Sequence, residues 1–359
     1  MSVKILQGDN RQVLKTLPDK SVHCCVTSPP YWGLRDYGCS NQIGLEPTLD
    51  AYIENMRTVG RELWRVLRDD GTLWLNLGDC YASQGGERTY GSHDGATGRA
   101  GQPGPRISAA GLKPKDLVGL PWRVAFALQA DGWYLRSDII WHKPNPMPES
   151  VQDRCCKSHE YIFLLSKSAR YYYDAAAIAE PVMETSLVRA ESGVTFGGNN
   201  LCPDTRLQSG KECIPKAEGA NSRMNRSRDP QHEHEYNGKN RSEDSQSPGR
   251  RMLKNLAANR DAGNGDTFNG VTRNKRSVWT VPTAGYSGAH FATYPPALIR
   301  PCILAGCPMQ GTVLDPFGGS GTVGEVAEEE GRNSILIELN PKYVELAERR
   351  TSQKGLFAQ

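Results

Sequence analysis

The sequence predicts an α/β fold built on a mostly parallel sheet. Two observations carry this prediction. Short apolar segments rich in Val, Ile and Leu alternate along the chain with segments of helical spacing. Two of the apolar segments run directly into loops rich in Pro or Gly, which is where ligands bind in such sheets. The order strand, helix, strand is the unit that joins parallel strands through helical crossovers.

Residues 1–174 form a first ordered block. Its longest helix has apolar residues three and four positions apart, such as Tyr52, Met56, Val59 and Leu63, and a turn at 69–71 closes it. The predicted order in this block is a strand at 3–6, a helix at 11–17, a strand at 22–26, a helix at 49–67, a strand at 72–77, a helix at 117–131, and strands at 134–141 and 161–165.

Two polar stretches interrupt the pattern. Residues 83–111 are rich in Gly, Ser and Arg and have no periodicity, which is typical of a long loop. In residues 175–276 aliphatic residues are sparse and Arg, Lys, Asn, Ser and Glu dominate. That composition is typical either of a disordered segment or of a module that orders on a polyanion.

Residues 277–359 form a second ordered block. Regular patterning resumes at Ser277-Val278-Trp279. The elements then predicted are a helix at 296–305, a strand at 313–314, a helix after Thr322, a strand at 335–337 and a terminal helix from Pro341. The two ordered blocks together are expected to form one sheet.

Bulk composition limits the classes of protein. The net charge is +3 and the pI about 8.3, so a nucleic-acid surface requires local clustering of Lys and Arg. No run of eighteen apolar residues occurs and no signal peptide precedes the first strand, which predicts a soluble, cytoplasmic protein without membrane contact. The ten cysteines include no CxxC pair, so reduced thiols are expected and no metal site is predicted.

The glycine-rich loop is Asp315-Pro316-Phe317-Gly318-Gly319-Ser320-Gly321-Thr322. Glycines lack a Cβ, so they permit a sharp turn and let a nucleotide-like ligand approach the backbone at a helix amino terminus. The next strand ends at Glu338, where acidic residues of such sheets bind ribose hydroxyls. No Lys follows Gly321-Thr322, which argues against a nucleoside triphosphatase.

The proline-rich loop is Thr27-Ser28-Pro29-Pro30-Tyr31-Trp32. The Ser28 hydroxyl and the Pro29 carbonyl are suited to accept the two hydrogens of a planar amine. The prolines hold those acceptors rigidly. Tyr31 can stack on a flat ring, with Trp32 as a second stacking residue.

Together, these two loops resemble the motifs of the amino-methylating DNA methyltransferases that use S-adenosylmethionine. The order matches the β-class arrangement, in which the catalytic segment precedes the cofactor segment. The resemblance implies a Rossmann-like class I methyltransferase fold with a seven-stranded, mostly parallel sheet and a circularly permuted motif order. Residues 1–174 would be the catalytic half, 175–276 an inserted target-recognition region, and 277–359 the cofactor-binding half.

The resemblance also assigns roles to residues. Ser28, Pro29, Pro30 and Tyr31 would be catalytic, and Tyr31 and Trp32 would stack on a base flipped out of the helix. Asp9 would contact the adenine, although a turn-forming role is an alternative, and His290 would pack on the methionine half or simply in the core. The implied cofactor-binding set is Asp9, Thr27, His290, Phe291, Pro295, Asp315, Phe317, Gly318, Gly319, Ser320, Gly321, Thr322 and Glu338.

Double-stranded DNA is the macromolecular partner that the resemblance implies. Basic side chains of the insertion and of the 83–111 loop are expected to neutralise phosphates. The predicted DNA-binding residues are Arg88, Arg99, Arg106, Lys143, Arg223, Arg226 and Arg228. Dimers are common in the family, and the sequence leaves open whether this protein is a homodimer. It also leaves open whether the protein acts with a cognate restriction endonuclease or alone, as an orphan enzyme.

The target atom stays open between two amines. In the family a Ser before Pro-Pro-Tyr favours cytosine N4, whereas Asp or Asn favours adenine N6. Methylation of an RNA base or of a glutamine amide also stays open, as does a DNA-binding regulator that has lost catalysis. A carbon-5 cytosine enzyme would need a Pro-Cys nucleophile, but Pro301-Cys302 lies inside a predicted helix, where Cys302 is expected to pack in the core.

Overall fold

The computed structural model describes residues 1–82, 111–182, 272–283 and 294–352. The chain divides into two compact units, residues 1–180 with 274–359 and residues 181–273. The first unit contains both ordered blocks. Most of the predicted loop at 83–111 and of the predicted insertion at 175–276 lies outside the described residues. At the edges of the insertion, β6 (Glu180–Pro181) pairs with β7 (Thr272–Arg273).

The first unit is organised on an eight-stranded sheet with the order β1-β10-β9-β2-β3-β5-β4-β8. Only β5 runs antiparallel to its neighbours. The strands are β1 (Val3–Gln7), β2 (Val22–Thr27), β3 (Leu67–Leu77), β4 (Tyr134–His142), β5 (His159–Ser166), β8 (Val278–Thr280), β9 (Thr312–Asp315) and β10 (Asn333–Glu338).

The two ordered blocks meet in the middle of this sheet. β2 from the first block pairs in parallel with β9 from the second, with Cys24 opposite Val313 and Cys25 opposite Leu314. β1 pairs in parallel with β10 along its whole length. The prediction of one sheet shared by both blocks is therefore confirmed, and it places the ends of β2 and β9 side by side.

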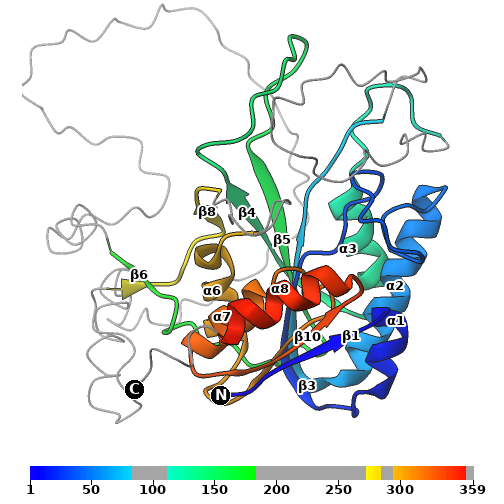
Figure 1. Ribbon diagram of the computed structural model, residues 1–359. Helices are drawn as coiled ribbons and strands as arrows, with labels where there is room; N and C mark the ends of the chain where they lie inside the picture. Colours follow the sequence, from blue (N-terminus) through cyan, green and yellow to red (C-terminus); the bar gives the residue numbers. More distant parts are fainter. Residues whose placement is uncertain (83–110, 183–271, 284–293, 353–359) are drawn as a thin grey trace, which may run out of the picture. The chain divides into compact units, whose positions relative to one another are not determined.

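Helices cover both faces of the sheet, as Figure 1 shows. On one face lie α1 (Asn10–Val13), α2 (Leu49–Val66) and α3 (Leu120–Ala130); on the other lie α6 (Pro296–Gly306), α7 (Thr322–Glu329) and α8 (Pro341–Ser352). Successive strand residues point to opposite faces, so Cys25 packs with the α2 side and Cys24 with the α6 side. The result is the three-layer arrangement of a doubly wound sheet.

Four details differ from the sequence-based expectation. The sheet has eight strands and not seven, because β8 adds to the outer edge of β4. The helix expected at 11–17 is a short α1 followed by a 3-10 turn at Leu14–Thr16. α3 begins at Leu120 and not at 117. β3 begins at Leu67 and not at 72, since Val22 pairs with Leu67 before an irregularity brings Thr72 opposite Cys24.

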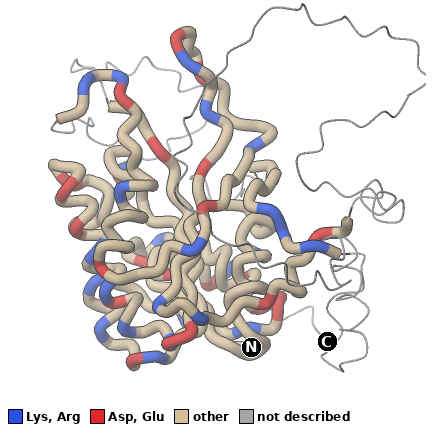
Figure 2. The backbone as a smooth tube through the Cα atoms, turned by 180° about the vertical axis from the view of Figure 1, so that it is seen from behind, with Lys and Arg blue, Asp and Glu red and all other residues tan. Residues whose placement is uncertain are grey.

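Basic and acidic residues alternate along the described chain. Figure 2 shows Lys and Arg interspersed with Asp and Glu along the backbone. Many of these charges are paired, as in the contacts of Arg57 with Asp131 and of Arg300 with Glu329. Among the described helices none is long and apolar enough to cross a membrane.

Candidate active site

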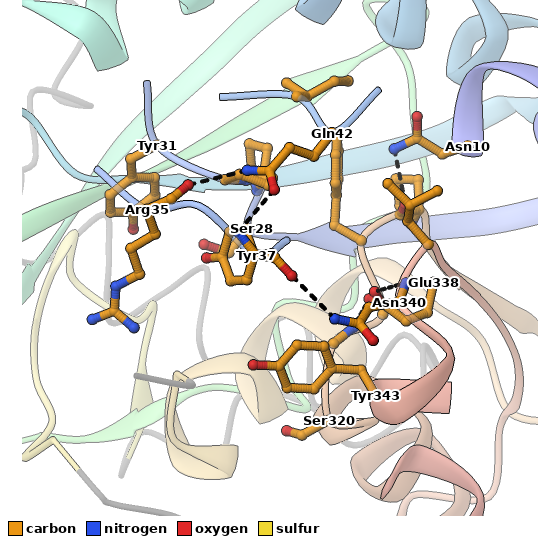
Figure 3. Close-up of a pocket in the computed structure, with 18 of the residues that line it drawn as sticks. Asn10, Ser28, Tyr31, Arg35, Tyr37, Gln42, Ser320, Glu338, Asn340 and Tyr343 are labelled. Carbon is orange, nitrogen blue, oxygen red and sulfur yellow. Dashed lines mark hydrogen bonds between the residues drawn. The ribbon is translucent and has the colours of Figure 1, made fainter. Parts of the chain in front are cut away.

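A cavity of about 510 Å³ opens at the carboxyl ends of the parallel strands. Residues that follow β1, β2, β9 and β10 line it, so both ordered blocks contribute to one site. Figure 3 shows Ser28 and Tyr31 on one side of this cavity and Ser320, Glu338 and Tyr343 on another. The predicted residues in the lining are Asp9, Ser28, Pro29, Pro30, Tyr31, Lys143, Phe317, Gly318, Gly319, Ser320, Thr322 and Glu338.

The glycine turn after β9 is fixed by close packing on its neighbours. A Cβ on Gly318 would lie 3.0 Å from the Leu336 Cβ, and one on Gly321 would lie 3.0 Å from the Ala347 Cα. Gly321 also has a φ of +83°, in the left-handed region that favours glycine. The turn is therefore pressed against β10 and α8. Gly321 does not itself line the cavity, and its contact with the cofactor stays a prediction.

Glu338 ends β10 with its carboxylate at the cavity. One oxygen accepts from the Gly319 amide at 2.8 Å, and the other accepts from the Asn340 amide at 2.8 Å. Burial raises the pKa of Glu338, although these amide hydrogen bonds oppose that effect. Each oxygen keeps a further lone pair, so the carboxylate can still accept hydroxyl hydrogens.

Asp315 lies behind the lining and not in it. Its side chain is 1% exposed and accepts hydrogen bonds from the Thr27 hydroxyl at 2.6 Å and the Tyr294 hydroxyl at 2.9 Å. Burial raises its pKa to about 6. The Thr27 hydroxyl and the Asp315 carboxylate therefore join β2 to β9, and the cofactor contacts of both residues stay a prediction.

Two further predicted cofactor residues, Ser320 and Thr322, share a buried donor. The Arg350 guanidinium, itself buried, donates to the hydroxyls of Ser320 at 3.1 Å and Thr322 at 2.8 Å. Both residues still line the cavity. Pro295 is buried at the start of α6 and does not line the cavity, whereas the neighbouring Tyr294 does; the cofactor contact of Pro295 stays a prediction.

Asp9 combines the two roles considered for it. Its carboxylate caps α1 by accepting from the Arg11 amide at 2.9 Å, and it pairs with the Arg11 guanidinium at 2.6 Å. Burial opposes ionisation, but the contacts with Arg11 outweigh it and lower the pKa of Asp9. The turn-forming role is confirmed, and contact with an adenine stays a prediction because the residue lines the cavity.

The turn after β2 presents its acceptors to the cavity. Ser28, Pro29, Pro30 and Tyr31 all line it. The Pro30 carbonyl is engaged from behind by the Tyr52 hydroxyl at 3.0 Å. Since Tyr52 is fully buried in α2, this bond anchors the turn to the helical layer.

Tyr31 lies at the centre of a hydrogen-bonded group. Its hydroxyl donates to Glu160 Oε2 at 2.7 Å and lies 3.4 Å from Asn76 Oδ1. A Cβ on Gly78 would lie 2.6 Å from the Tyr31 ring, so glycine at this position leaves room for the ring. Burial and the adjacent Glu160 raise the pKa of Tyr31 well above its usual range, which keeps the phenol protonated.

Glu160 connects Tyr31 to a cation. Its other oxygen forms an ion pair with the Lys143 ammonium, and both side chains are mostly buried. The ammonium also lies 4.2 Å from the centre of the Trp141 ring. Lys143 lines the cavity with this carboxylate partner, and its contact with DNA phosphate stays a prediction.

Trp32 is not placed to stack on a base. It is 2% exposed, packs in the core on the α2 side, and its indole nitrogen donates to the Glu46 carbonyl at 2.8 Å. The predicted stacking role of Trp32 is therefore corrected to a core role. Tyr31 is the aromatic residue of this turn that reaches the cavity.

Sequence reasoning missed the segment that closes one side of the cavity. Arg35, Tyr37 and Gln42 line it together with Asn340 and Tyr343. The Asn340 amide nitrogen donates to the Tyr37 carbonyl at 3.3 Å, and the rings of Tyr37 and Tyr343 meet edge to face (Figure 3). The detectable signals were the aromatic and Gly residues after Trp32 and the Asn two positions after the acidic strand end.

Cys302 packs in the core, as the sequence predicted. It is 1% exposed within α6, which leaves no accessible thiol for a nucleophilic role. Burial raises the pKa of its thiol. Outside the described residues lie His290, Phe291, Arg88, Arg99, Arg106, Arg223, Arg226 and Arg228.

Comparison with known proteins gives a family match and several full-length relatives. A DNA methylase family model, N6/N4 methyltransferase, matches residues 22–349. The Type II methyltransferase M.Cfr9I of Citrobacter freundii is 41% identical over 96% of this chain and 86% of its own length. The Type II methyltransferase M.SmaI of Serratia marcescens is also 41% identical, over 97% of this chain and 90% of its own length.

Solved structures show the same fold at low sequence identity. The PvuII DNA methyltransferase, described as cytosine-N4-specific, superposes with a TM-score of 0.56 at 15% identity, over 98% of this chain and 86% of that one. A putative DNA modification methylase of Thermus thermophilus, complexed with S-adenosylmethionine, superposes with a TM-score of 0.51 at 19% identity, over 99% of this chain and 96% of that one.

Proposed function

The chain belongs to the N6/N4 DNA methylase family, and we propose that it methylates the N4 amine of cytosine in double-stranded DNA. Membership confirms the predicted class of enzyme, an S-adenosylmethionine-dependent DNA methyltransferase that acts on an exocyclic amine. The choice of cytosine over adenine and the roles of individual residues are the proposal.

The residues around the cavity fit S-adenosylmethionine. Glu338 would hold the ribose hydroxyls, because its carboxylate keeps lone pairs after accepting two backbone amides. The turn at Gly318 and Gly319 would admit the ligand close to the backbone, and Asp9 and Phe317 line the same space. When bound, the cofactor supplies an electrophilic methyl group on a sulfonium. The DNA supplies the amine, and the protein supplies the groups that position it.

One observation carries the proposal: the acceptors for an amine and the glycine turn open into a single cavity. β2 and β9 are neighbours in the sheet, and the 2.6 Å bond between Thr27 and Asp315 joins their carboxyl ends. Ser28 directly follows one strand, and the turn containing Gly318 follows the other. A donor and an acceptor bound at these two turns would therefore be neighbours, which is the positioning that a direct transfer requires.

The turn after β2 would prepare the amine for reaction. The lone pair of an exocyclic amine is delocalised into the ring, so the nitrogen is a weak nucleophile. Hydrogen bonds from the two amino hydrogens to the Ser28 hydroxyl and the Pro29 carbonyl would favour a tetrahedral nitrogen whose lone pair is free to attack. Tyr31 would stack on the extruded base, which offsets part of the cost of unstacking.

Cytosine is favoured by the residue that precedes Pro-Pro-Tyr. Ser28 supplies a neutral hydroxyl, the form that leans toward cytosine N4 in the family, whereas a carboxylate or amide there leans toward adenine N6. Adenine N6 is therefore the competing outcome of the test. The insertion would recognise the bases that flank the target. We also propose that the enzyme acts on DNA in the cytoplasm of a bacterial cell.

The experiment is to incubate mixed-sequence duplex DNA with the protein and S-adenosylmethionine carrying a labelled methyl group. The DNA is then digested to nucleosides, which are separated and weighed. We expect the label in N4-methyldeoxycytidine. Label in N6-methyldeoxyadenosine would overturn the choice of base, and label in neither nucleoside would overturn the activity.

Parallel reactions with RNA and with a glutamine-containing protein extract test the competing acceptors. Transfer to either of these at a higher rate than to duplex DNA would contradict the proposal. Binding of duplex DNA without any transfer would indicate a regulator that has lost catalysis. Mapping the modified positions would then define the recognition sequence, and sedimentation would show whether the active species is a homodimer.

A further inference from the structure

We propose that Glu160 accepts the proton that the target amine releases, receiving it through the hydroxyls of Ser28 and Tyr31. The inference rests on the proposed function, because it names a residue that would serve the same methyl transfer. The residue that it names lies outside the proline-rich loop: Glu160 is on β5, far in sequence from the turn after β2.

Methyl transfer to an amine creates a proton that must leave. The carbon–sulfur bond of the sulfonium breaks as the carbon–nitrogen bond forms, and the sulfur keeps the bonding electron pair. The amine nitrogen then carries a positive charge until one of its hydrogens departs. A serine hydroxyl can accept a hydrogen bond, but it cannot hold that proton as a stable cation near neutral pH. A base is needed behind Ser28.

The turn that carries Ser28 also leads to such a base. Ser28 and Tyr31 both line the cavity, and the Tyr31 hydroxyl donates to Glu160 Oε2 at 2.7 Å. The path requires the Ser28 hydroxyl to donate to the Tyr31 oxygen when the amine is bound. Each hydroxyl can take a proton on one lone pair while giving up its own on the other side. One proton would leave the amine nitrogen and one would arrive on the Glu160 carboxylate, so charge and atoms balance.

The surroundings of Glu160 point to a chemical role more than to a structural one. Glu160 and Lys143 form an ion pair whose side chains are 15% and 18% exposed, so both charges have lost much of their water. Such pairs often stabilise a fold no better than neutral residues would. A glutamine could hold Tyr31 equally well, but only a carboxylate can accept its proton.

Several ionisable groups lie close to this carboxylate. Lys143 contacts it from the segment after β4, and Tyr31 contacts it from the turn after β2. Asn76 Nδ2 of β3 lies 3.4 Å from Glu160 Oε2. The charged or titratable groups near Glu160 are Tyr31, Asp79, His142, Lys143, Lys157 and His159.

The test compares Glu160→Gln with wild-type protein in single-turnover methylation of duplex DNA at neutral pH, in H2O and in D2O, with cofactor in excess. Single-turnover rates report the transfer and not the release of products. We expect Glu160→Gln to lower the rate about 100-fold, the usual scale for a lost general base. Wild-type transfer should be slower in D2O, because protons move along this path, and the variant should lose that isotope effect. Glu54→Gln, on the exposed surface of α2, is the matched control and should behave as wild type.

Two further variants separate proton transfer from positioning. Tyr31→Phe keeps the ring and breaks the path, so Tyr31→Phe combined with Glu160→Gln should be no slower than the slower single variant. Glu160→Asp should recover part of the rate. A purely structural role of Glu160 would leave the solvent isotope effect unchanged in all of these variants.

The outcomes also separate this proposal from the proposed function. Wild-type protein that labels neither amine removes both. Wild-type protein that labels DNA, together with a Glu160→Gln variant of normal rate or of unchanged solvent isotope effect, overturns the proton path alone. Cofactor affinity is measured for each variant by calorimetry, and a loss of affinity equal to the loss of rate would also contradict it.

Discussion

The turn after β2 and the turn after β9 stand side by side at one edge of the sheet and work differently. The turn after β9 depends on its backbone: a Cβ at Gly318 or Gly321 would approach Leu336 or Ala347 to 3.0 Å. The turn after β2 depends on side chains, since Ser28 lines the cavity and the Tyr31 hydroxyl donates to Glu160.

This difference has a physical reason. The cofactor side must bind a ligand of fixed shape, and close backbone approach gives that without moving parts. The amine side must accept hydrogen bonds and dispose of a proton, which requires groups that can exchange protons. Substitutions in one turn should therefore change binding, and those in the other should change turnover.

The largest expected effect is on turnover. Ser28→Ala removes an acceptor for the amine, and the rate constant for transfer should fall about 10²- to 10³-fold, the scale seen when one preorganised hydrogen bond is lost. The dissociation constant of S-adenosylmethionine should not change, because Ser28 belongs to the turn that holds the amine. Rapid-quench assays and calorimetry measure the two quantities. An equal loss of transfer rate and of cofactor affinity would mean that the two turns do not act separately on turnover and on binding.

Asp315 joins the two turns, and its protonation should be visible in stability. Burial raises its pKa from 3.8 to about 6, so the folded protein binds a proton here over a range in which the unfolded chain has released it. The free energy of unfolding should therefore fall as the pH rises from about 4 to about 6. Relative to Asp315→Asn, the fall should be on the order of 3 kcal/mol. Urea titrations at several pH values measure it, and parallel curves for the two proteins would refute the assignment.

Close packing of the glycine turn can be tested against a glycine in open space. Gly321 and Gly111 have φ values of +83° and +86°, but no described atom lies within 4 Å of a Cβ on Gly111. Gly321→Ala should cost about 2 kcal/mol more free energy of unfolding than Gly111→Ala, because overpacking adds to the shared backbone strain. Gly321→Ala should also weaken cofactor binding. Equal costs for the two substitutions would show that the contact with Ala347 is unimportant.

The smallest expected effect is on cofactor affinity alone. In Glu338→Gln an NH2 group replaces one carboxylate oxygen, so one backbone amide loses its acceptor and the ribose hydroxyls are bound more weakly. The dissociation constant of S-adenosylmethionine should therefore rise about tenfold. The rate at saturating cofactor should stay near that of wild type. Glu345→Gln, exposed on α8, serves as the control. A fall in the saturated rate without a change in affinity would reverse the roles given to the two turns.

Much of the fold could be predicted because burial leaves a strong pattern. β2 and β9 are both buried runs, and each ends in a distinctive loop, so their convergence followed from the rule that parallel strands present their carboxyl ends together. The strand count was off by one, since β8 is a three-residue edge strand and too short to give a periodic signal.

The site was harder to predict because exposure is decided by tertiary packing. Trp32 and Tyr31 are adjacent aromatic residues, and nothing in their order shows that only Tyr31 reaches the cavity. Lys143 resembled a phosphate-binding residue until the antiparallel pairing of β4 and β5 placed it against Glu160. Asp315 matched the motif, but its partners Thr27 and Tyr294 come from other elements.

The central claim is that a methyl donor held at the turn after β9 meets an amine held at the turn after β2. It is tested most directly by binding S-adenosylmethionine with a ¹³C-labelled methyl group and recording nuclear Overhauser contacts from that methyl. A cross-peak to the Tyr31 ring protons, absent in Tyr31→Leu, is the predicted result. A bound methyl group with contacts only to residues outside this cavity would contradict it.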